Sequence, residues 1–108
     1  MINVLVIFDS CSGATETLAL AAAVGAVQAR ANIRMRRLPD HSSESNETLG
    51  RMRREYVPPT AADTHWADAV IIGMNGKVCG MVDNPADATT FGRRVAEETR
   101  TLKPSVPK

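Results

Sequence analysis

The residues with the clearest chemical potential lie in the turn after the first apolar run of the chain. The segment Asp9 to Thr17 reads DSCSGATET and combines the hydroxyl groups of Ser10, Ser12 and Thr15 with the flexible Gly13. If a helix begins here, its free amide groups and the positive end of its dipole can hold a phosphate without any lysine or arginine. A capped helix start explains the same spacing equally well. From spacing alone, the two interpretations stay open.

Other common chemistries lack their residues in this chain. It has neither the GxxxxGK[ST] loop of triphosphate sites nor the GxGxxG fingerprint of dinucleotide folds. There is no GxSxG elbow and no Cys/His spacing suited to zinc, so His41 and His65 are interpreted as surface residues. Trp66, a single aromatic before a strand, is interpreted as a core anchor rather than a ligand platform.

The charge balance argues against nucleic acid and anionic membranes as partners. Thirteen basic and twelve acidic side chains leave a net charge of +1. Basic residues cluster at 34–37 and 51–54, but acidic neighbours favour a solvated strand end and a solvated helix face. The longest apolar run is too short to cross a bilayer and is no signal peptide, which predicts a cytoplasmic protein. Cys11 and Cys79 are expected to be reduced thiols.

A strand and a helix flank the turn. Ile2 to Phe8 is almost wholly apolar and β-branched, which predicts a central strand covered on both faces. Thr15 to about Arg30 is rich in alanine and leucine without proline, which predicts a helix. No charged or amide side chain occurs between Leu18 and Val27. Either this helix is mostly buried, or alanine is present for its helix propensity alone.

Further elements follow along the chain. Asn32 to Leu38 alternates like a half-exposed edge strand, and Glu47 to Tyr56 predicts a short charged helix. Thr60 can cap a short helical turn. Ala69 to Met74 predicts a third strand buried on both sides, and Lys77 to Val82 predicts a fourth.

Only Asn75-Gly76 separates these last two strands. Two residues are too few for a parallel crossover, and Asn-Gly is the strongest short hairpin signal, so the fourth strand should pair antiparallel. Asn84-Pro85 then starts a final helix with Phe91, Val95 and Leu102 on one apolar face. We expect the tail 104–108 to be frayed.

The element order indicates a single α/β domain at residues 1–103. Right-handed crossovers place the parallel strands in the order 2-1-3. In open sheets of this kind, ligands bind beyond the carboxyl ends of the strands, where the first turn lies.

Three segments carry a resemblance to a known family. VLVIFDSCSGATETLA resembles the phosphate loop of flavodoxin-like proteins, which reads hydroxyl, any, hydroxyl, Gly, any, Thr, Glu. RMRREYVPPTAADTHWADAVIIG and FGRRVAEETRTL resemble the approach to the third strand and the final helix of the WrbA-type NAD(P)H:quinone oxidoreductases. The similarity covers most of the chain and implies a flavodoxin-like three-layer sandwich, shortened in the middle.

The resemblance also implies a cofactor, a reaction and a site. FMN would be bound, with NAD(P)H and a quinone as the partners of an FMN-dependent oxidoreductase. The phosphate residues would be Ser10, Cys11, Ser12, Gly13, Ala14 and Thr15, and the flavin ring would lie against Met74, Asn75 and Gly76. At this second position the family has a Gly-Thr-Pro-type loop and then a crossover helix, and this chain lacks both.

Two other functions fit parts of the sequence. The altered ring loop favours a degenerate flavodoxin-like fold that survives as an interaction or oligomerisation module. Cys11 near a helix start resembles the phosphocysteine of small sugar-transport IIB domains, although Asp9 and Ser10 separate it from the strand.

The missing crossover helix should leave one sheet face bare. Either residues 41–57 fold over that face or a second subunit does, because large exposed apolar patches are uncommon on monomers. We therefore predict a homodimer.

Overall fold

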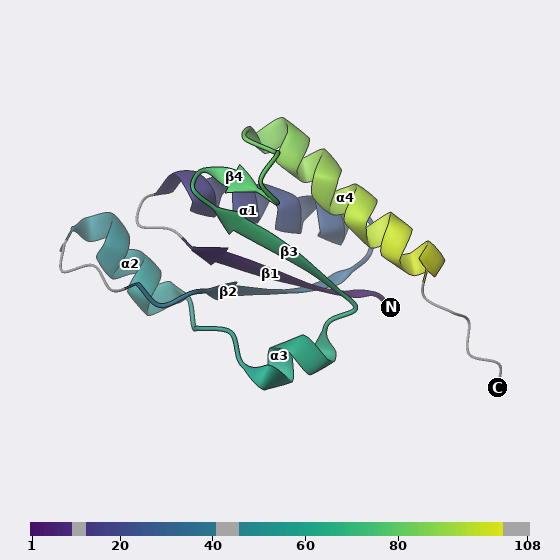
Figure 1. The fold of residues 1–108 in the computed structure, drawn as a ribbon, viewed down its shortest axis with the longest axis horizontal. Coiled ribbons are helices and arrows are strands. Elements are labelled where there is room, and N and C mark those ends of the chain that lie inside the picture. Colours follow the sequence, from purple (N-terminus) through teal and green to yellow (C-terminus); the bar gives the residue numbers. More distant parts are fainter. Residues whose placement is uncertain (10–12, 41–45, 103–108) are drawn as a thin grey trace.

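One open sheet of four strands forms the centre of the molecule (Figure 1). The computed structural model describes residues 1–9, 13–40 and 46–102. The strands stand in the order β2-β1-β3-β4, with β1 at Asn3–Asp9, β2 at Asn32–Arg37, β3 at Ala69–Met74 and β4 at Lys77–Val78. Strand β1 pairs parallel with β2 and β3, while β4 pairs antiparallel with β3. The predicted α/β class, the order 2-1-3 and the antiparallel fourth strand are confirmed.

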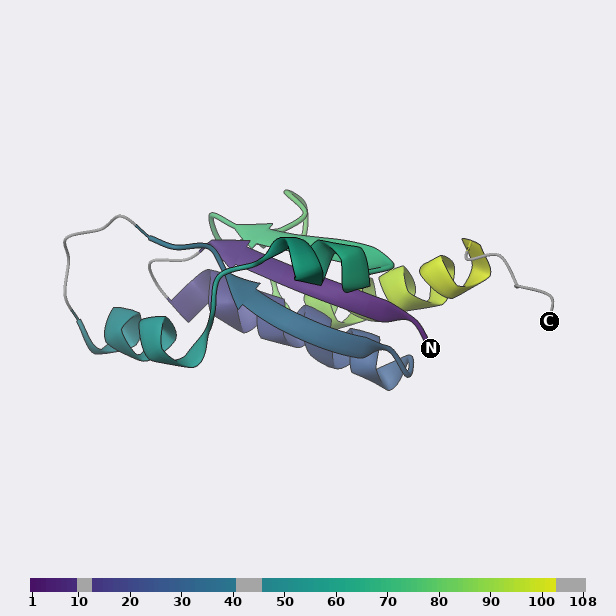
Figure 2. The same cartoon turned by 90° about the horizontal axis from the view of Figure 1, so that it is seen from below.

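Helices cover the two sheet faces unequally. Helices α1 (Gly13–Gln28) and α4 (Pro85–Leu102) lie on one side, and the short helix α3 (Ala61–Trp66) lies on the other (Figure 2). Helix α2 (Glu47–Glu55) lies past the carboxyl ends of β1 and β2. Asn46 caps α2, Asn84 caps α4, and Thr60 forms a capping box with Asp63 at α3. The caps predicted at Thr60 and Asn84 are therefore confirmed.

Strand β1 is buried on both of its faces, as predicted. Val4, Val6 and Phe8 belong to the core under α1, which also includes Leu49 and Met52 of α2. Leu5, which points to the other face by strand alternation, is fully buried as well. Helices explain this double burial, because α1 packs on one face of β1 and α3 contacts the other.

Helices α1 and α4 approach each other through small residues. A Cβ atom added at Gly92 would overlap the carbonyl oxygen of Ala22, and one added at Gly25 would overlap that of Thr89. Ala88, Gly92 and Ala96 form the buried stripe of α4. The predicted stripe is wrong at Leu102, which is 82% exposed, while Phe91 and Val95 are only partly buried.

The two interpretations of α1 are also decided. Its inner side is buried, but Leu20, Val24 and Val27 are about half exposed along the outer side. Alanine is therefore present here for helix propensity and close packing rather than for a second buried face. Within the described residues, no helix is both long and apolar enough to span a bilayer.

The prediction that β3 is buried on both sides is wrong. Ile71 is buried under the helices, whereas Val70, Ile72 and Met74 on the other face are each 43 to 44% exposed. Helix α3 sits over β1 and β2 and leaves this row uncovered (Figure 2). The described part of segment 41–57 packs at the carboxyl end of the strands, beside the beginning of α1, so it does not cover the row either.

Strand β4 is shorter than predicted. It ends at Val78 instead of Val82, because Cys79 and Gly80 take φ values of 50° and 73° and turn the chain back. Val78 and Val82 then form an isolated antiparallel bridge. The preceding hairpin is as predicted, with φ values of 53° and 73° at its two turn residues, Asn75 and Gly76, typical of a type I′ turn.

Candidate functional site

The candidate anion site lies where β1 ends and α1 begins. Ser10, Cys11 and Ser12 fall outside the described residues, whereas Gly13, Ala14 and Thr15 form the first turn of α1. The amide groups of a first helical turn have no partner inside the helix, and they lie at the positive end of its dipole. Among the described residues, none lies within 4 Å of a Cβ added at Gly13.

Thr15 ties the start of α1 to the β3–β4 turn. Its side chain is buried, with 3% exposure, and its hydroxyl Oγ1 accepts a hydrogen bond of 2.8 Å from the Gly76 N–H. Gly73 permits this approach, because a Cβ there would lie 3.3 Å from the Thr15 methyl carbon. The structure thus brings together two segments that the sequence assigned to the site separately. A hydroxyl that accepts one hydrogen bond can still donate another.

The other side of this junction is a closed hairpin. Met74 pairs directly with Lys77, so only Asn75 and Gly76 form the turn. The Gly76 N–H is already bound to Thr15. The loop that would lie against a flavin ring in the resembled family is therefore replaced by a two-residue turn.

A buried acid next to the candidate site was not found by sequence reasoning. Glu16 is 5% exposed, and its carboxylate accepts hydrogen bonds from Arg51, at 2.5 and 2.8 Å, and from the Tyr56 hydroxyl at 2.7 Å. The bidentate Arg51 contact is the main cause that lowers the pKa of Glu16, against the effect of burial. Burial, followed by the hydrogen bond to Glu16, raises the pKa of Tyr56 to about 12. This cluster fixes α2 beside the beginning of α1.

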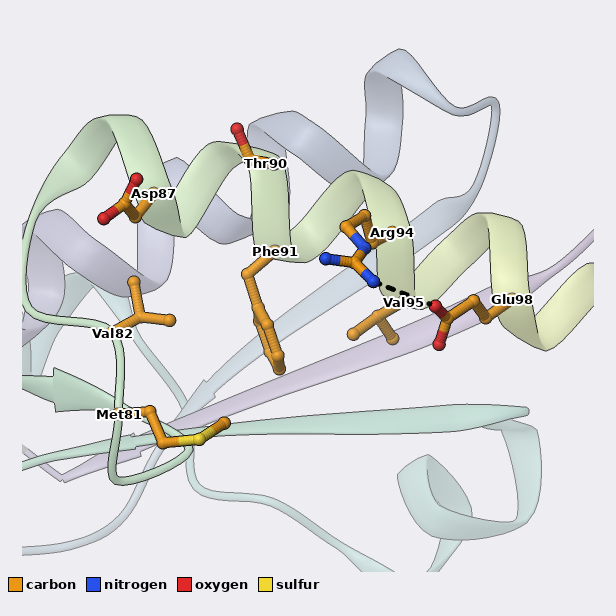
Figure 3. Close-up of a pocket in the computed structure, with 8 residues that line it drawn as sticks. All are labelled: Met81, Val82, Asp87, Thr90, Phe91, Arg94, Val95 and Glu98. Atoms are coloured by element: carbon orange, nitrogen blue, oxygen red, sulfur yellow. Dashed lines mark ion pairs between the residues drawn. The ribbon is translucent and has the colours of Figure 1, made fainter.

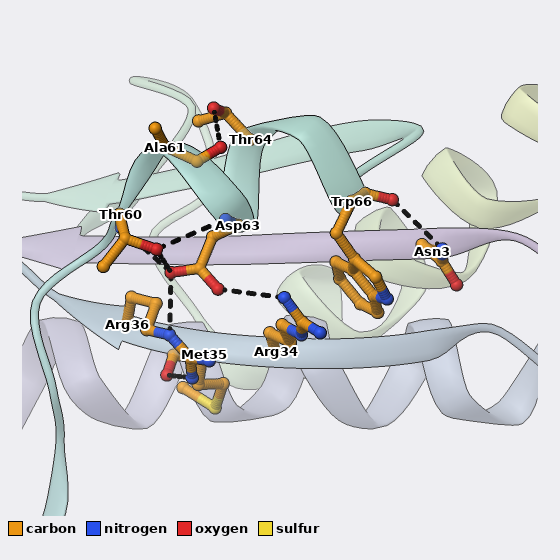
Figure 4. A network of polar contacts seen from close by, with 9 residues as sticks. All are labelled: Asn3, Arg34, Met35, Arg36, Thr60, Ala61, Asp63, Thr64 and Trp66. Atoms are coloured by element: carbon orange, nitrogen blue, oxygen red, sulfur yellow. Dashed lines mark hydrogen bonds and ion pairs between the residues drawn. The ribbon is translucent and has the colours of Figure 1, made fainter.

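The basic residues of β2 are also partnered. Arg34 and Arg36 contact the Asp63 carboxylate of α3 at 3.2 and 3.0 Å (Figure 4). The Arg36 hydrogen bond is the largest influence lowering the pKa of Asp63 to about 2. Arg34 also lies over the ring of Trp66, 4.3 Å from its centre. Trp66 is half-buried outside the core cluster, so the prediction of a core anchor is wrong.

A second acid bridges two arginines at the end of β2. Asp40 lies 2.9 Å from Arg37 and 2.6 Å from Arg53, and these arginines hold the pKa of its carboxyl well below the usual range, with the Arg53 hydrogen bond as the main cause. The prediction of solvated arginines is wrong for Arg37, whose side chain is buried. Internal ion pairs therefore neutralise much of the apparent basic character.

The described histidine and cysteine side chains do not belong to the candidate site. His65 is exposed and Cys79 is a free, exposed thiol, while His41 and Cys11 lie outside the described residues. Across residues 1–9, 13–40 and 46–102, no group of three His, Cys, Asp or Glu side chains is arranged to hold a metal ion.

Comparison with protein-family models and with curated proteins finds no match to this chain. The family resemblance therefore depends on the motif residues themselves, and the function is argued below from their geometry.

Proposed function

We propose that this chain binds FMN, with the flavin phosphate held at the turn between β1 and α1. The phosphate ligands would be backbone amides of the first turn together with the hydroxyls of Ser10, Ser12 and Thr15. When bound, FMN would supply hydride chemistry, while the protein would supply position and electrostatics.

The observation that carries the proposal is the 2.8 Å hydrogen bond between Thr15 Oγ1 and the Gly76 N–H. It holds the beginning of α1 beside the end of β3, at the carboxyl edge of the parallel strands where ligands bind in open sheets. The described residues leave the position of a Gly13 Cβ free, which supports the same location, because a close ligand needs a residue without a side chain there. A helix start needs no basic residue to attract a phosphate.

The described residues fit the phosphate better than the ring. Glycine, a buried threonine and a sixteen-residue helix suit an anion at the turn. The Met74 to Gly76 hairpin is short, and its Gly76 amide is already used by Thr15. We therefore expect FMN binding to depend mainly on the phosphate, and quinone reduction with NAD(P)H stays a prediction from the resemblance.

A titration of FMN fluorescence tests the proposal, with riboflavin as the matched ligand because it lacks only the phosphate. We expect FMN to be quenched and riboflavin to bind at least about tenfold more weakly, since charge-assisted hydrogen bonds to the phosphate are worth about 1.5 to 3 kcal/mol. The variant Thr15→Val should weaken FMN binding. Thr17→Val is the matched control, because the Thr17 hydroxyl only donates to the Gly13 carbonyl within the helix.

Two results would contradict FMN binding at this turn. The first is no quenching by FMN at high micromolar concentration. The second is equal binding of FMN and riboflavin, which would place any flavin contact away from the turn. A purified protein with a flavin absorption spectrum would support the proposal directly.

A non-catalytic interaction module is the second candidate, and the closed Asn75-Gly76 hairpin favours it. In that case the Thr15 to Gly76 bond serves stability alone. Simultaneous replacement of Ser10, Ser12 and Thr15 by alanine distinguishes the two functions. If the thermal shift with FMN survives the triple change, or never existed, the module is the better description.

A further inference from the structure

The outer edge of β3 is open over its first half. Strand β4 pairs only with Gly73 and Met74, and the next contact on this side runs from the Cys79 N–H to the Ile72 carbonyl at 2.7 Å. Backbone groups in a strand alternate in direction, so the N–H and C=O of Val70 point to the same side as those of Ile72. Among the described strands, none lies beside Val70 there. An open, uncharged edge is a template for another strand.

A groove with both apolar and charged lining residues lies between α4 and the segment that follows β4, on the β3 side of α4. It has a volume of about 460 Å³, and Figure 3 shows Phe91 and Val95 pointing from α4 toward β3, with Met81 and Val82 along one wall. Phe91 and Val95 are only partly buried against the core. Helix α4 thus covers one side of the position where a further strand of the sheet would lie next to β3.

The rim of the groove carries unequal charge. Asp87 and Glu98 are acidic, and Arg94 is the basic residue among the lining side chains, 3.5 Å from Glu98. Two acids against one base favour an occupant with a positive charge.

We propose that this groove and the β3 edge form a docking site for one extended, basic-apolar segment of a partner protein, added as a strand beside β3. Backbone hydrogen bonds to Val70 would fix its direction, and every second side chain would enter the groove against Phe91 and Val95. A lysine or arginine at the end of the segment would reach Glu98. This site is separate from the turn at α1, so it does not depend on FMN binding.

A second copy of the chain fits this site poorly. Its own β3 carries its own α4 on the same sheet face (Figure 1). Pairing of two β3 edges would bring two α4 helices over one groove of 460 Å³, a volume suited to a few side chains. A segment with no helix attached avoids this clash.

The test measures binding of a fluorescein-labelled peptide, KVTVTVTK, by fluorescence anisotropy without FMN; its valines and its last lysine share one face of a strand. We expect saturable binding, and the peptide KVTPTVTK should bind much more weakly because proline removes a ladder donor. Val95→Lys should weaken binding by about tenfold or more, since an apolar contact is lost. Val24→Lys is the matched control, as this exposed valine lies on the outer side of α1.

A milder variant tests whether weaker peptide binding could result from misfolding. Glu98→Gln alters an exposed side chain, and circular dichroism should show an unchanged fold. It should weaken KVTVTVTK binding about twofold to fivefold, with less effect at high salt.

Three results would overturn the proposal. They are equal binding of the proline peptide, equal weakening by Val24→Lys, and a dimer in sedimentation velocity that Val95→Lys converts to monomer. The last would identify a second copy as the occupant.

Discussion

Replacement of Gly92 by alanine should separate the α1–α4 pair. The added Cβ would overlap the Ala22 carbonyl oxygen and lie 2.7 Å from the Ala22 carbonyl carbon, about 0.7 Å short of the 3.4 Å at which ordinary contact begins. The obstacle is helix backbone, which cannot rotate away like a side chain. The cost should therefore lie near the upper end for overpacked cores, about 3 kcal/mol. Alanine regains about 1 kcal/mol of helix propensity, so the net loss should be about 2 kcal/mol.

Gly50 provides the matched control in α2. A Cβ there would have only the flexible end of Arg54 nearby, at 3.3 Å. Gly50→Ala should therefore gain up to about 1 kcal/mol from propensity alone. Urea unfolding, followed by circular dichroism and Trp66 fluorescence, gives both free energies of unfolding. The reasoning fails if Gly92→Ala is as stable as the parent chain, or if the two variants change stability in the same direction.

Three further predictions concern titration and assembly. Ultraviolet titration of Tyr56, the single tyrosine, should give a pKa of about 12, and because this lies above the unfolded value, stability should fall as the pH rises from about 10 toward 12. The pKa of Asp63 is lowered to about 2, so its contribution to stability should be complete above about pH 4 and lost as the pH falls toward 2; Asp63→Asn should remove that part of the acid transition. The predicted homodimer should appear in light scattering at twice the chain mass, and a population of 11.6 kDa monomers alone would contradict it.

Local rules predicted much of the fold. The Asn75-Gly76 turn and the Asn84 cap depend on neighbouring residues, and both occur where the sequence placed them. The sequence did not show in the same way which strand faces are covered by elements distant in the chain. The run from Ala69 to Met74 is apolar throughout, yet its outer row is exposed, because hydrophobicity along a strand does not reveal whether another element covers it.

Small residues explain the error on α4. Phe91 and Leu102 are strongly hydrophobic and therefore mark an apolar helix face in the sequence, whereas Ala88 and Gly92 contribute little hydrophobicity. Close approach of two helices selects small side chains instead, and this demand is visible only when the facing backbone is known.

The candidate site was predictable only where it depends on residues close together in the sequence. The hydroxyl and glycine spacing of the first turn is local, and strand order explains why Thr15 meets Gly76. The Glu16 to Arg51 pair joins residues 35 apart through a segment with no regular pattern. Each of its members, taken alone, looks like an ordinary surface charge.

One local feature connects the two proposed sites. The Asn75-Gly76 turn closes β3 onto β4 and delivers the Gly76 N–H to Thr15. The positive φ values of Cys79 and Gly80 then end β4 after two residues. The short β4 in turn leaves the Val70 edge open. An occupant beside Val70 and a ligand at the α1 turn would therefore contact opposite ends of one strand, β3. Lengthening the hairpin should disturb the first site through Thr15 and the second through the sheet edge, whereas Val95→Lys should affect only the second.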